Sequence, residues 1–308
     1  MKWFKSLNNK QIAIIALIIA NTIWGAASPI FKWSLQNIPL FTLAFFRFYF
    51  ATLLLLPFAI RQNLRLTGEG IIKIASLTFF GITVNIIFFF LGLKFAPSIN
   101  APIIASSGPI LLIIASILIL KEKPAKKTII GTCVGLIGVF IIILRPLLEN
   151  GFNFSAILGN SFFVLATIGA VGHTIVSKEI LGRYSALYIT FWSFLLGSIS
   201  FFPFFLSETF ANNGILRLDI RGWTGLIFGI FLSSTLAYLI YEWAIEKMTA
   251  SETGIFTYVD PVVATIIAIP LLHEVITPLF ILGSFFVFLG IFVAEGRFHW
   301  HPLHILHN

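Results

Sequence analysis

Ionisable side chains are rare in this 308-residue sequence, and three of them lie inside long apolar stretches: His173, Glu242 and Asp260. Ionisable groups in an apolar span are costly and usually face the protein interior or a water-filled path. We therefore expect Asp260 and Glu242 to exchange protons or to recognise a substrate ammonium, with His173 as a polar partner. The alternatives are that Glu242 reaches the nearby membrane interface and that His173 is a satisfied interior imidazole.

A fourth ionisable group, Arg47, lies within the predicted span 40–60. Its planar guanidinium suits a substrate carboxylate, although it could equally satisfy helix-end carbonyls and a lipid phosphate. Side chains in or beside other spans are candidate pocket walls: Trp24, Asn85, Asn100 and Tyr238. Because the chain has 35 phenylalanines, an aromatic residue in a span is by itself weak evidence of a pocket.

Two of the predicted spans contain a proline where a helix would break: Ser106-Ser107-Gly108-Pro109 and Tyr258-Val259-Asp260-Pro261. Proline lacks the backbone donor and frees the carbonyl four residues earlier, here at Ala105 and Thr257. Helix breaks at corresponding positions of two halves point to a substrate site. Pro109 and Pro261 are thus helix breaks that bring Ser107 and Tyr258 to the candidate site, unless the breaks are packing kinks only.

The elements that must position these residues are membrane helices. The chain is 58% hydrophobic and 10% charged, against about 25% charged in soluble domains. That composition excludes a soluble enzyme or a disordered chain. A spanning helix needs about 20 apolar residues, and ten runs fit: 12–31, 40–60, 74–93, 101–120, 128–145, 156–176, 184–206, 222–243, 254–272 and 278–295. We expect the first to be a span and not a cleaved signal peptide.

The distribution of lysine and arginine predicts the orientation. Fourteen of them fall in loops on the side of the two termini and five on the other side, with Arg47 inside a span. Positive charge marks the cytoplasmic side, so both termini are predicted to be cytoplasmic. The net charge of +8 is then a topology signal, and we expect no nucleic-acid partner.

The two halves of the chain resemble each other. Lys32 and Lys178 lie 146 residues apart, as do Pro57 and Pro203. An offset of 152 relates the later pairs: Pro109 to Pro261, Glu122 to Glu274, Gly131 to Gly283, Gly138 to Gly290, and Arg145 to Arg297. Because five spans per half is an odd number, the second half enters the membrane from the opposite side. The predicted fold is all-α, with two inverted five-helix repeats at 1–150 and 151–308, as in secondary transporters.

This inversion places two lysines and two glutamates at opposite ends of the spans. Lys32 and Glu274 fall at outer ends, and Lys178 and Glu122 at inner ends. One ion pair could close each mouth of a carrier, the two pairs forming alternately. The alternative is four separately hydrated charges, with each glutamate near the start of a helix, where acidic residues are favoured.

Several of these residues identify a family resemblance. The chain resembles the drug/metabolite transporter superfamily, of the EamA type, through Trp24-Gly25 and Pro29, through Arg47 in Phe45-Phe46-Arg47-Phe48, and through the duplicated Pro-to-Glu segments with their following glycines. The resemblance covers the whole chain and implies a metabolite exporter of a prokaryotic inner membrane. The second half has Ser193 where the first has Arg47, so no second arginine is implied.

We therefore expect a secondary transporter that exports amino acids or related small metabolites by alternating access, coupled to protons or to exchange. The alternative is an integral membrane enzyme or sensor. No His-Glu-x-x-His motif and no phosphate-binding loop occur in the sequence, so we expect no enzymatic activity, metal or cofactor. The expected partners are a small-molecule substrate and the lipid bilayer. Gly131, Gly135 and Gly138 form a packing face that serves either the monomer or a homodimer.

Overall fold

The computed structural model describes residues 8–62, 68–119, 126–150, 153–181, 183–211, 217–248, 253 and 255–295. Within this part, the chain forms a helical bundle without a named strand. The first half contains α1 (Asn9–Ser34), α2 (Leu40–Ala59), α3 (Gly68–Thr78), η2 (Phe79–Val84), α4 (Asn85–Phe95), α5 (Asn100–Ala105), α6 (Gly108–Ile119) and α7 (Lys126–Asn150). The second contains α8 (Phe154–Ile180), α9 (Ala186–Ala211), α10 (Ile220–Ile227), η3 (Phe228–Leu236), α11 (Ala237–Lys247), η4 (Ile255–Tyr258), α13 (Val259–Leu272) and α14 (Pro278–Glu295).

The apolar runs fold as helices long enough to cross a bilayer. Seven continuous helical stretches in the described residues are of that length and composition, and Phe256–Leu272 and Pro278–Ala294 form shorter apolar helices. The predicted run 101–120 is divided, because α5 ends at Ala105 and α6 begins at Gly108, directly before Pro109. These helices make the chain a multi-pass membrane protein.

Two of the long helical stretches, those over the predicted runs 74–93 and 222–243, each contain a π-helical segment. η2 interrupts the stretch Gly68–Phe95, and η3 interrupts Ile220–Lys247. A π segment widens the helix locally and often occurs at functional sites. The two segments lie at corresponding places in the two halves, since Gly81 of η2 and Ser233 of η3 differ by the offset of 152.

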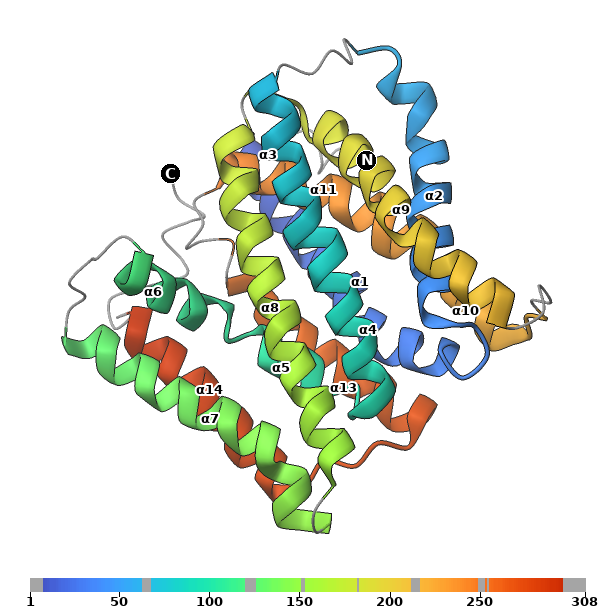
Figure 1. The fold of residues 1–308 in the computed structure, drawn as a ribbon. Coiled ribbons are helices and arrows are strands. Elements are labelled where there is room, and N and C mark those ends of the chain that lie inside the picture. The colour runs from blue at the N-terminus through green and yellow to red at the C-terminus, as the bar shows by residue number, and fades with distance from the viewer. Residues whose placement is uncertain are drawn as a thin grey trace.

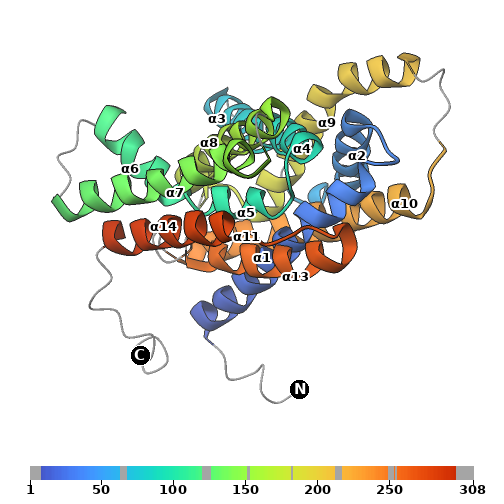
Figure 2. The same cartoon turned by 90° about the horizontal axis from the view of Figure 1, so that it is seen from below.

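The bundle has two sides. Figure 2 shows α3, α4 and α8 on one side, α1, α11 and α13 on the other, and α5 between them. Across the chain, α2 packs on α9, α4 on α8, and α1 on both α11 and α13. Each of these pairs joins a helix of the first half to a helix of the second, so the core is built from both halves.

Helices α7 and α14 form a pair at one edge of the bundle (Figure 1). The pair is close because glycines face glycines. A methyl group added at Gly131 would lie 2.6 Å from the carbonyl oxygen of Gly290, and one at Gly138 would lie 2.6 Å from that of Gly283. The small-residue face of the predicted span 128–145 therefore packs within the chain in this structure, as small residues commonly do between membrane helices.

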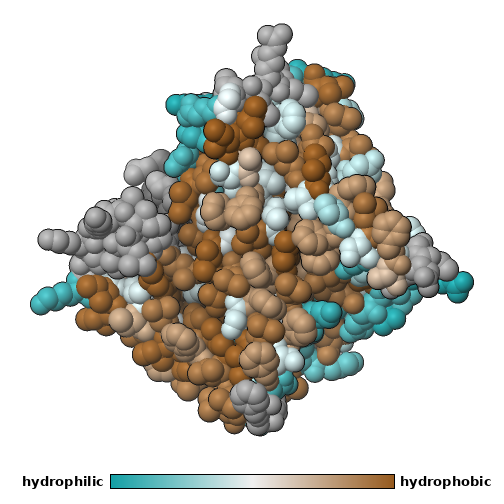
Figure 3. Space-filling model, in the orientation of Figure 1, coloured by the Kyte–Doolittle hydropathy of each residue, from teal (hydrophilic) through white to brown (hydrophobic). Residues whose placement is uncertain are grey.

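The outer surface of the bundle suits a lipid environment. Large apolar side chains are exposed along many helices, for example Phe58 of α2, Phe140 of α7 and Phe285 of α14. Figure 3 shows hydrophobic residues over most of one face, with the hydrophilic residues near its margins. A soluble protein rarely exposes an apolar surface of this extent, so lipid is expected to cover it.

Candidate functional site

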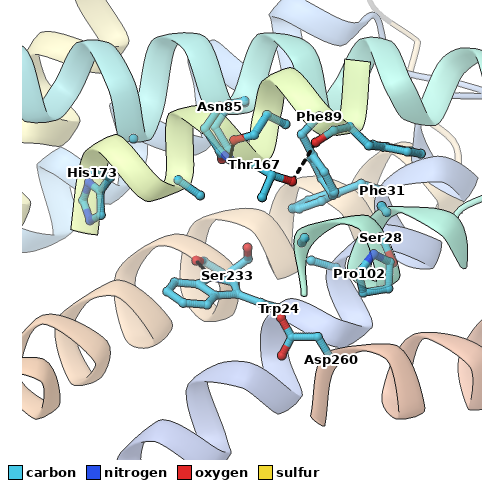
Figure 4. A pocket seen from close by; sticks show the side chains of 18 of the residues that line it. Trp24, Ser28, Phe31, Asn85, Phe89, Pro102, Thr167, His173, Ser233 and Asp260 are labelled. Atoms are coloured by element: carbon cyan, nitrogen blue, oxygen red, sulfur yellow. Dashed lines mark hydrogen bonds between the residues drawn. The ribbon is translucent and has the colours of Figure 1, made fainter. Parts of the chain in front are cut away.

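A cavity lies at the centre of the bundle and holds about 950 Å³ of space free of atoms, the part open to solvent included. Its walls come from α1, α2, η2, α4, α5, α8, η3, α11 and α13. Figure 4 shows Asn85, Thr167 and His173 facing Trp24, Ser233 and Asp260 across it.

The cavity is mostly apolar and aromatic. Its aromatic walls are Trp24, Phe31, Phe89, Phe163, Tyr238 and Tyr241. Trp24 contacts both tyrosines, with ring centroids 5.2 Å from Tyr238 and 4.9 Å from Tyr241. A few polar groups in an otherwise apolar pocket usually fix the orientation of a ligand, so the charged lining residues decide what the site can recognise.

Arg47 lines the cavity although it is only 2% exposed. Its Nε donates to Ser234 Oγ at 2.8 Å, and its Nη2 donates to Ser233 Oγ at 3.2 Å. The guanidinium also lies over the rings of Phe31 and Phe48, 4.9 and 4.7 Å from their centroids. Both hydroxyls belong to η3, so the π segment of the second half holds the arginine of the first. The burial rules out the contact with lipid phosphate that the sequence left open.

Arg47 has no carboxylate within ion-pair distance among the described residues. Hydroxyl groups and aromatic faces stabilise a guanidinium without neutralising it. The cavity therefore contains a fixed positive charge that an anionic group of a ligand could neutralise.

Asp260, near the start of α13, lines the same cavity. Its Oδ1 atom is buried and has no hydrogen-bond partner among the described residues. The backbone of Asp260 lies against α1 at Gly25, where an added methyl group would be 2.7 Å from the carbonyl oxygen of Asp260. The glycine of the Trp24-Gly25 pair thus allows α13 to approach closely enough for Asp260 to reach the cavity.

His173 and Glu242 form a buried pair at another edge of the cavity. Nε2 of His173 lies 2.7 Å from Oε1 of Glu242, and Ser177 Oγ donates to Glu242 Oε2 at 2.6 Å. Glu242 is only 1% exposed, so the alternative that it reaches the membrane interface is wrong. His173 lines the cavity and Glu242 lies behind it. The predicted partnership of His173 therefore involves Glu242, and no contact with Asp260 is found in the described part.

The remaining lining candidates include Asn85, whose Nδ2 donates to the carbonyl of Ala166 on α8 at 2.8 Å. Trp24 donates from Nε1 to the carbonyl of Ser233 at 3.2 Å. Together with Tyr238, these side chains are pocket walls. Ala105, whose carbonyl was expected to be freed by Pro109, also lines the cavity.

Besides Glu242, five candidates for the substrate site and its helix breaks lie outside the lining. Asn100 donates to Asn160 Oδ1 at 2.8 Å and so joins α5 to α8. Ser107 donates to the carbonyl of Ile104 at 2.6 Å, within the break between α5 and α6. The ring of Tyr258 packs edge-on against Phe288 of α14, 5.4 Å between centroids. Pro109 and Pro261 lie in the first turns of α6 and α13, so these breaks shape the cavity without lining it.

At the predicted outer end, Lys32 and Glu274 form an ion pair with 3.2 Å between Nζ and Oε1. Glu274 also accepts hydrogen bonds from the backbone N–H groups of Ser98 and Ile99, at 2.7 and 3.0 Å, directly before α5. Lys32 donates to the carbonyl of Ala96 at the end of α4. One carboxylate therefore joins the second half to two segments of the first.

Lys178 occupies the corresponding place in the second half. Its ammonium donates to the carbonyls of Ile245 and Met248 at the end of α11. Its predicted partner Glu122 lies outside the described residues, so the second ion pair stays a prediction. Lys32 thus caps the C-terminal end of the stretch Gly68–Phe95, and Lys178 caps that of Ile220–Lys247. Cations are favoured at this end of a helix.

The sequence did not single out Ser177, Ser233, Ser234 or Tyr241. Ser177 follows His173 by one helical turn, a spacing that places both on one face, and this signal could have found it. Ser233-Ser234 stands in an apolar run as the only adjacent serine pair of its span. The π segment sets the direction in which the two serine side chains point. The hydrophobic period of the sequence does not reveal where a π segment lies.

Comparison with known proteins agrees with this architecture. The EamA-like transporter family matches residues 11–144 and again residues 157–295. An uncharacterized transporter of Archaeoglobus fulgidus is 29% identical over 92% of this chain and 98% of its own length. The uncharacterized transporter YetK of Bacillus subtilis is also 29% identical, over 94% and 88%.

An S-adenosylmethionine uptake transporter of Rickettsia bellii is 28% identical over 76% of each chain. A crystal structure of a protein 15% identical in sequence superposes with a TM-score of 0.62, over 92% of this chain and 98% of its own. The fold is therefore shared with a solved protein. The two family matches together span most of the sequence, and they confirm the resemblance carried by Trp24-Gly25 and Arg47: the protein is a multi-pass membrane transporter that belongs to the EamA-like transporter family.

Proposed function

We propose that this transporter carries small zwitterionic metabolites, of which amino acids are the simplest, out of the cell by alternating access. The observation that carries the proposal is that Arg47 and Asp260 line one cavity and that neither is paired with an opposite charge among the described residues. A substrate with a carboxylate and an ammonium supplies both missing partners. We assign the carboxylate to Arg47 and the ammonium to Asp260.

The cost of burying charge supports this assignment. An uncompensated charge inside a membrane protein is expensive, and leaving one partner of a buried pair alone typically costs about 3–5 kcal/mol. A bound zwitterion relieves both charges at once and adds no net charge to the cavity. The aromatic walls then accommodate the apolar part of the substrate. S-adenosylmethionine, named for the Rickettsia relative, carries the same two charged groups.

We further propose that the chain has ten spans, formed by the seven long stretches together with α5–α6, η4–α13 and α14. Its halves, 1–150 and 151–308, are taken to be inverted repeats. The matching π segments and the two lysine caps support this proposal. Both termini are assigned to the cytoplasmic side of a prokaryotic inner membrane, on the charge distribution of the loops.

In such a carrier the ends of the cavity close alternately. The contacts of Glu274 with Lys32, Ser98 and Ile99 are assigned to the closed outer end. Lys178 and Glu122 are assigned the same role at the inner end. Each proposed pair would join segments of opposite halves, so breaking one pair while the other forms would move the opening from one side of the membrane to the other.

The experiment compares extracellular metabolites of cells that overproduce the intact protein, Asp260→Asn, or Arg47→Gln. Glu179→Gln is the matched control, since Glu179 is exposed on α8 and lies outside the cavity. We expect one or more amino acids to accumulate outside with the intact protein and with Glu179→Gln only. Equal profiles in all strains and in an empty-vector strain contradict export. Depletion of an amino acid from the medium by the intact protein reverses the assigned direction.

A further inference from the structure

We propose that His173, Glu242 and Ser177 form a proton-binding site, and that a proton bound there opposes binding of the substrate ammonium in the adjoining cavity. The inference rests on the proposed function for the identity of the substrate, and it adds the group through which transport is coupled to protons. The site lies between α8, which supplies His173 and Ser177, and α11, which supplies Glu242.

The geometry defines where protons are held. Both carboxylate oxygens of Glu242 are occupied, one by His173 Nε2 at 2.7 Å and the other by Ser177 Oγ at 2.6 Å. The second ring nitrogen of His173, Nδ1, is buried and has no partner among the described residues. With a neutral imidazole, the pair carries one negative charge. A proton added at Nδ1 converts it to an imidazolium–carboxylate pair without net charge.

The position of His173 links this site to the cavity. His173 lines the cavity, and Glu242 does not. The Nδ1 side of the ring faces Gly81 of η2, another lining residue, where an added Cβ would overlap the ring. The imidazole therefore lies between the cavity and Glu242, whose carboxylate stabilises the protonated ring from behind. Release to cavity water on the other side of the membrane returns the pair to its original charge.

Other titratable or charged groups surround the pair on several elements: Tyr238 and Tyr241 on α11, Arg47 on α2, Lys178 on α8 and Asp260 on α13. The two cations have other partners, since Arg47 donates to serine hydroxyls and Lys178 to helix-end carbonyls. From α1 and α9 the neighbours are aromatic, Trp24 and Phe194 packing on Tyr238. The imidazole is thus the cation-forming group bonded to Glu242.

The charge change opposes substrate binding in a defined way. An imidazolium at the cavity wall repels an ammonium held by Asp260, because both positive charges lie within one apolar cavity, where screening by water is weak. Proton and zwitterion then exclude each other. A carrier with that property exchanges one for the other, and an inward proton gradient drives the metabolite outward.

The first test reads the proton directly and needs no substrate. The full-length protein is labelled with ¹⁵N-histidine in lipid nanodiscs, and the His173 signal is identified by its loss in His173→Gln. We expect this signal to change as the pH is varied, because the ring takes up a proton at Nδ1. Because Glu242→Gln removes the negative charge bonded to the ring, the signal of this variant should respond to pH differently from that of the wild type. A His173 signal that stays constant, or that titrates identically in Glu242→Gln, overturns the proton site.

The second test measures coupling in liposomes containing the purified protein and an equimolar mixture of the twenty standard amino acids, analysed by mass spectrometry. With one-for-one exchange, a gradient of one pH unit supports about tenfold accumulation. Glu242→Gln should lose the gradient-driven accumulation of amino acid that the wild type shows. Glu246→Gln is the matched control, because Glu246 lies one turn further along α11 and pairs with Lys247 near the surface.

The outcomes separate the two proposals. Exchange that responds equally to the gradient in the wild type and in Glu242→Gln overturns the proton site and leaves the zwitterion carrier standing. Absence of exchange for every amino acid, together with a titrating His173, contradicts the proposed substrate class and supports the site. If Glu242→Gln fails to fold, the titration of the wild-type His173 still decides whether the site takes up a proton.

Discussion

Two contacts at corresponding positions of the halves differ completely in chemistry. In the first half, Phe31 of α1 meets Phe90 of α4 edge-on, with 5.3 Å between ring centroids. In the second half, the residues at the matching offsets are Ser177 of α8 and Glu242 of α11, joined by a hydrogen bond of 2.6 Å. Both contacts join the first long helix of a half to its third, and both are buried.

The residue that follows each position is the same. Lys32 follows Phe31, Lys178 follows Ser177, and each lysine donates to carbonyls at the end of that same third stretch. The contacts of the two lysines with helix ends are therefore matched between the halves. The contacts of the preceding residues, Phe31 and Ser177, are not. At this pair of positions, an ionisable side chain is therefore present in the second half only.

The largest effect is expected from Phe90→Glu, which places a carboxylate in the first half at the position that corresponds to Glu242. Phe90 is fully buried against Phe31, and no histidine or serine stands in place to receive a carboxylate. Loss of a buried phenylalanine alone costs about 3–5 kcal/mol, and an unpaired charge adds to that. We expect little folded protein, measured as the monodisperse fraction in size-exclusion chromatography.

Phe90→Leu is the control for that variant, because it keeps the site apolar and should leave most of the protein folded. If Phe90→Glu behaves like Phe90→Leu, the position tolerates charge. The apolar pair would then have no structural reason to differ from the Ser177–Glu242 pair.

A smaller change tests the π segment beside His173. A methyl group at Gly81 would overlap the imidazole, and overpacking of this kind typically costs about 1–3 kcal/mol. Gly81→Ala should therefore lower the melting temperature and displace His173 from Glu242, which a shift of the ¹⁵N-histidine signal would show. Gly68→Ala is the control, because nothing lies within 4 Å of the added carbon. An unshifted His173 signal would contradict the packing argument.

The outer ion pair offers a third test. Glu274→Ala removes the acceptor of two backbone N–H groups and of Lys32, and hydrogen bonds to a charged group contribute about 1.5–3 kcal/mol. In a Cys133→Ser background, Ser28→Cys places a thiol at the wall of the cavity. With Glu274→Ala, this thiol should react at least tenfold faster with an impermeant thiol reagent added outside than it does with Glu274 intact. Unchanged labelling would show that the ion pair does not close the cavity from that side.

The smallest effect is expected at Asp219, which precedes α10 at the membrane edge. Its carboxylate accepts from the Arg221 guanidinium and from the backbone N–H groups of Arg221 and Gly222, and these hydrogen bonds hold its pKa below the usual value. A lowered folded-state pKa stabilises the fold above the unfolded pKa, about 3.9, and this stabilisation is lost as the pH falls through the folded value.

Asp219→Asn keeps a capping side chain and removes the charge. We expect a slightly lower melting temperature than the wild type at pH 7, and a difference that disappears at low pH. Asn153→Ala, which removes the uncharged cap of α8, should lower the melting temperature equally at both pH values. A difference for Asp219→Asn that is independent of pH would contradict the role of the charge.

Much of the fold could be predicted from the sequence, because apolar runs of membrane length have few alternatives to helices. The division of the run 101–120 followed from Pro109, since proline cannot continue the hydrogen-bond ladder. The family followed from the duplicated motifs. The π segments did not, because a helix apolar on all sides shows no period from which an extra residue in a turn could be read.

Some of the residues that line the cavity could be predicted from the sequence, whereas their pairings could not. Arg47 and Asp260 stood out because charge is rare in a span, and both line the cavity. The partners of Arg47 are Ser233 and Ser234. An uncharged serine in a span does not stand out in the sequence as a charged residue does. The alternative that Glu242 reaches the membrane interface was wrong, because its distance from the helix end says nothing about which side of the helix faces lipid. That side is set by the packing of α8 on α11.

The π segments have a consequence for length. The two stretches that contain them are 28 residues each, close to the 26 residues of α1 and the 27 of α8 and longer than the 20 of α2. At 1.5 Å per residue an α-helix of 28 residues would reach about 42 Å, well beyond the roughly 30 Å of a hydrocarbon core. This excess of helix length over the thickness of the hydrocarbon core is present in both halves. If either segment changed to α-helix, every residue on one side of it would rotate by part of a turn, which would withdraw Ser233 from Arg47 or Gly81 from His173.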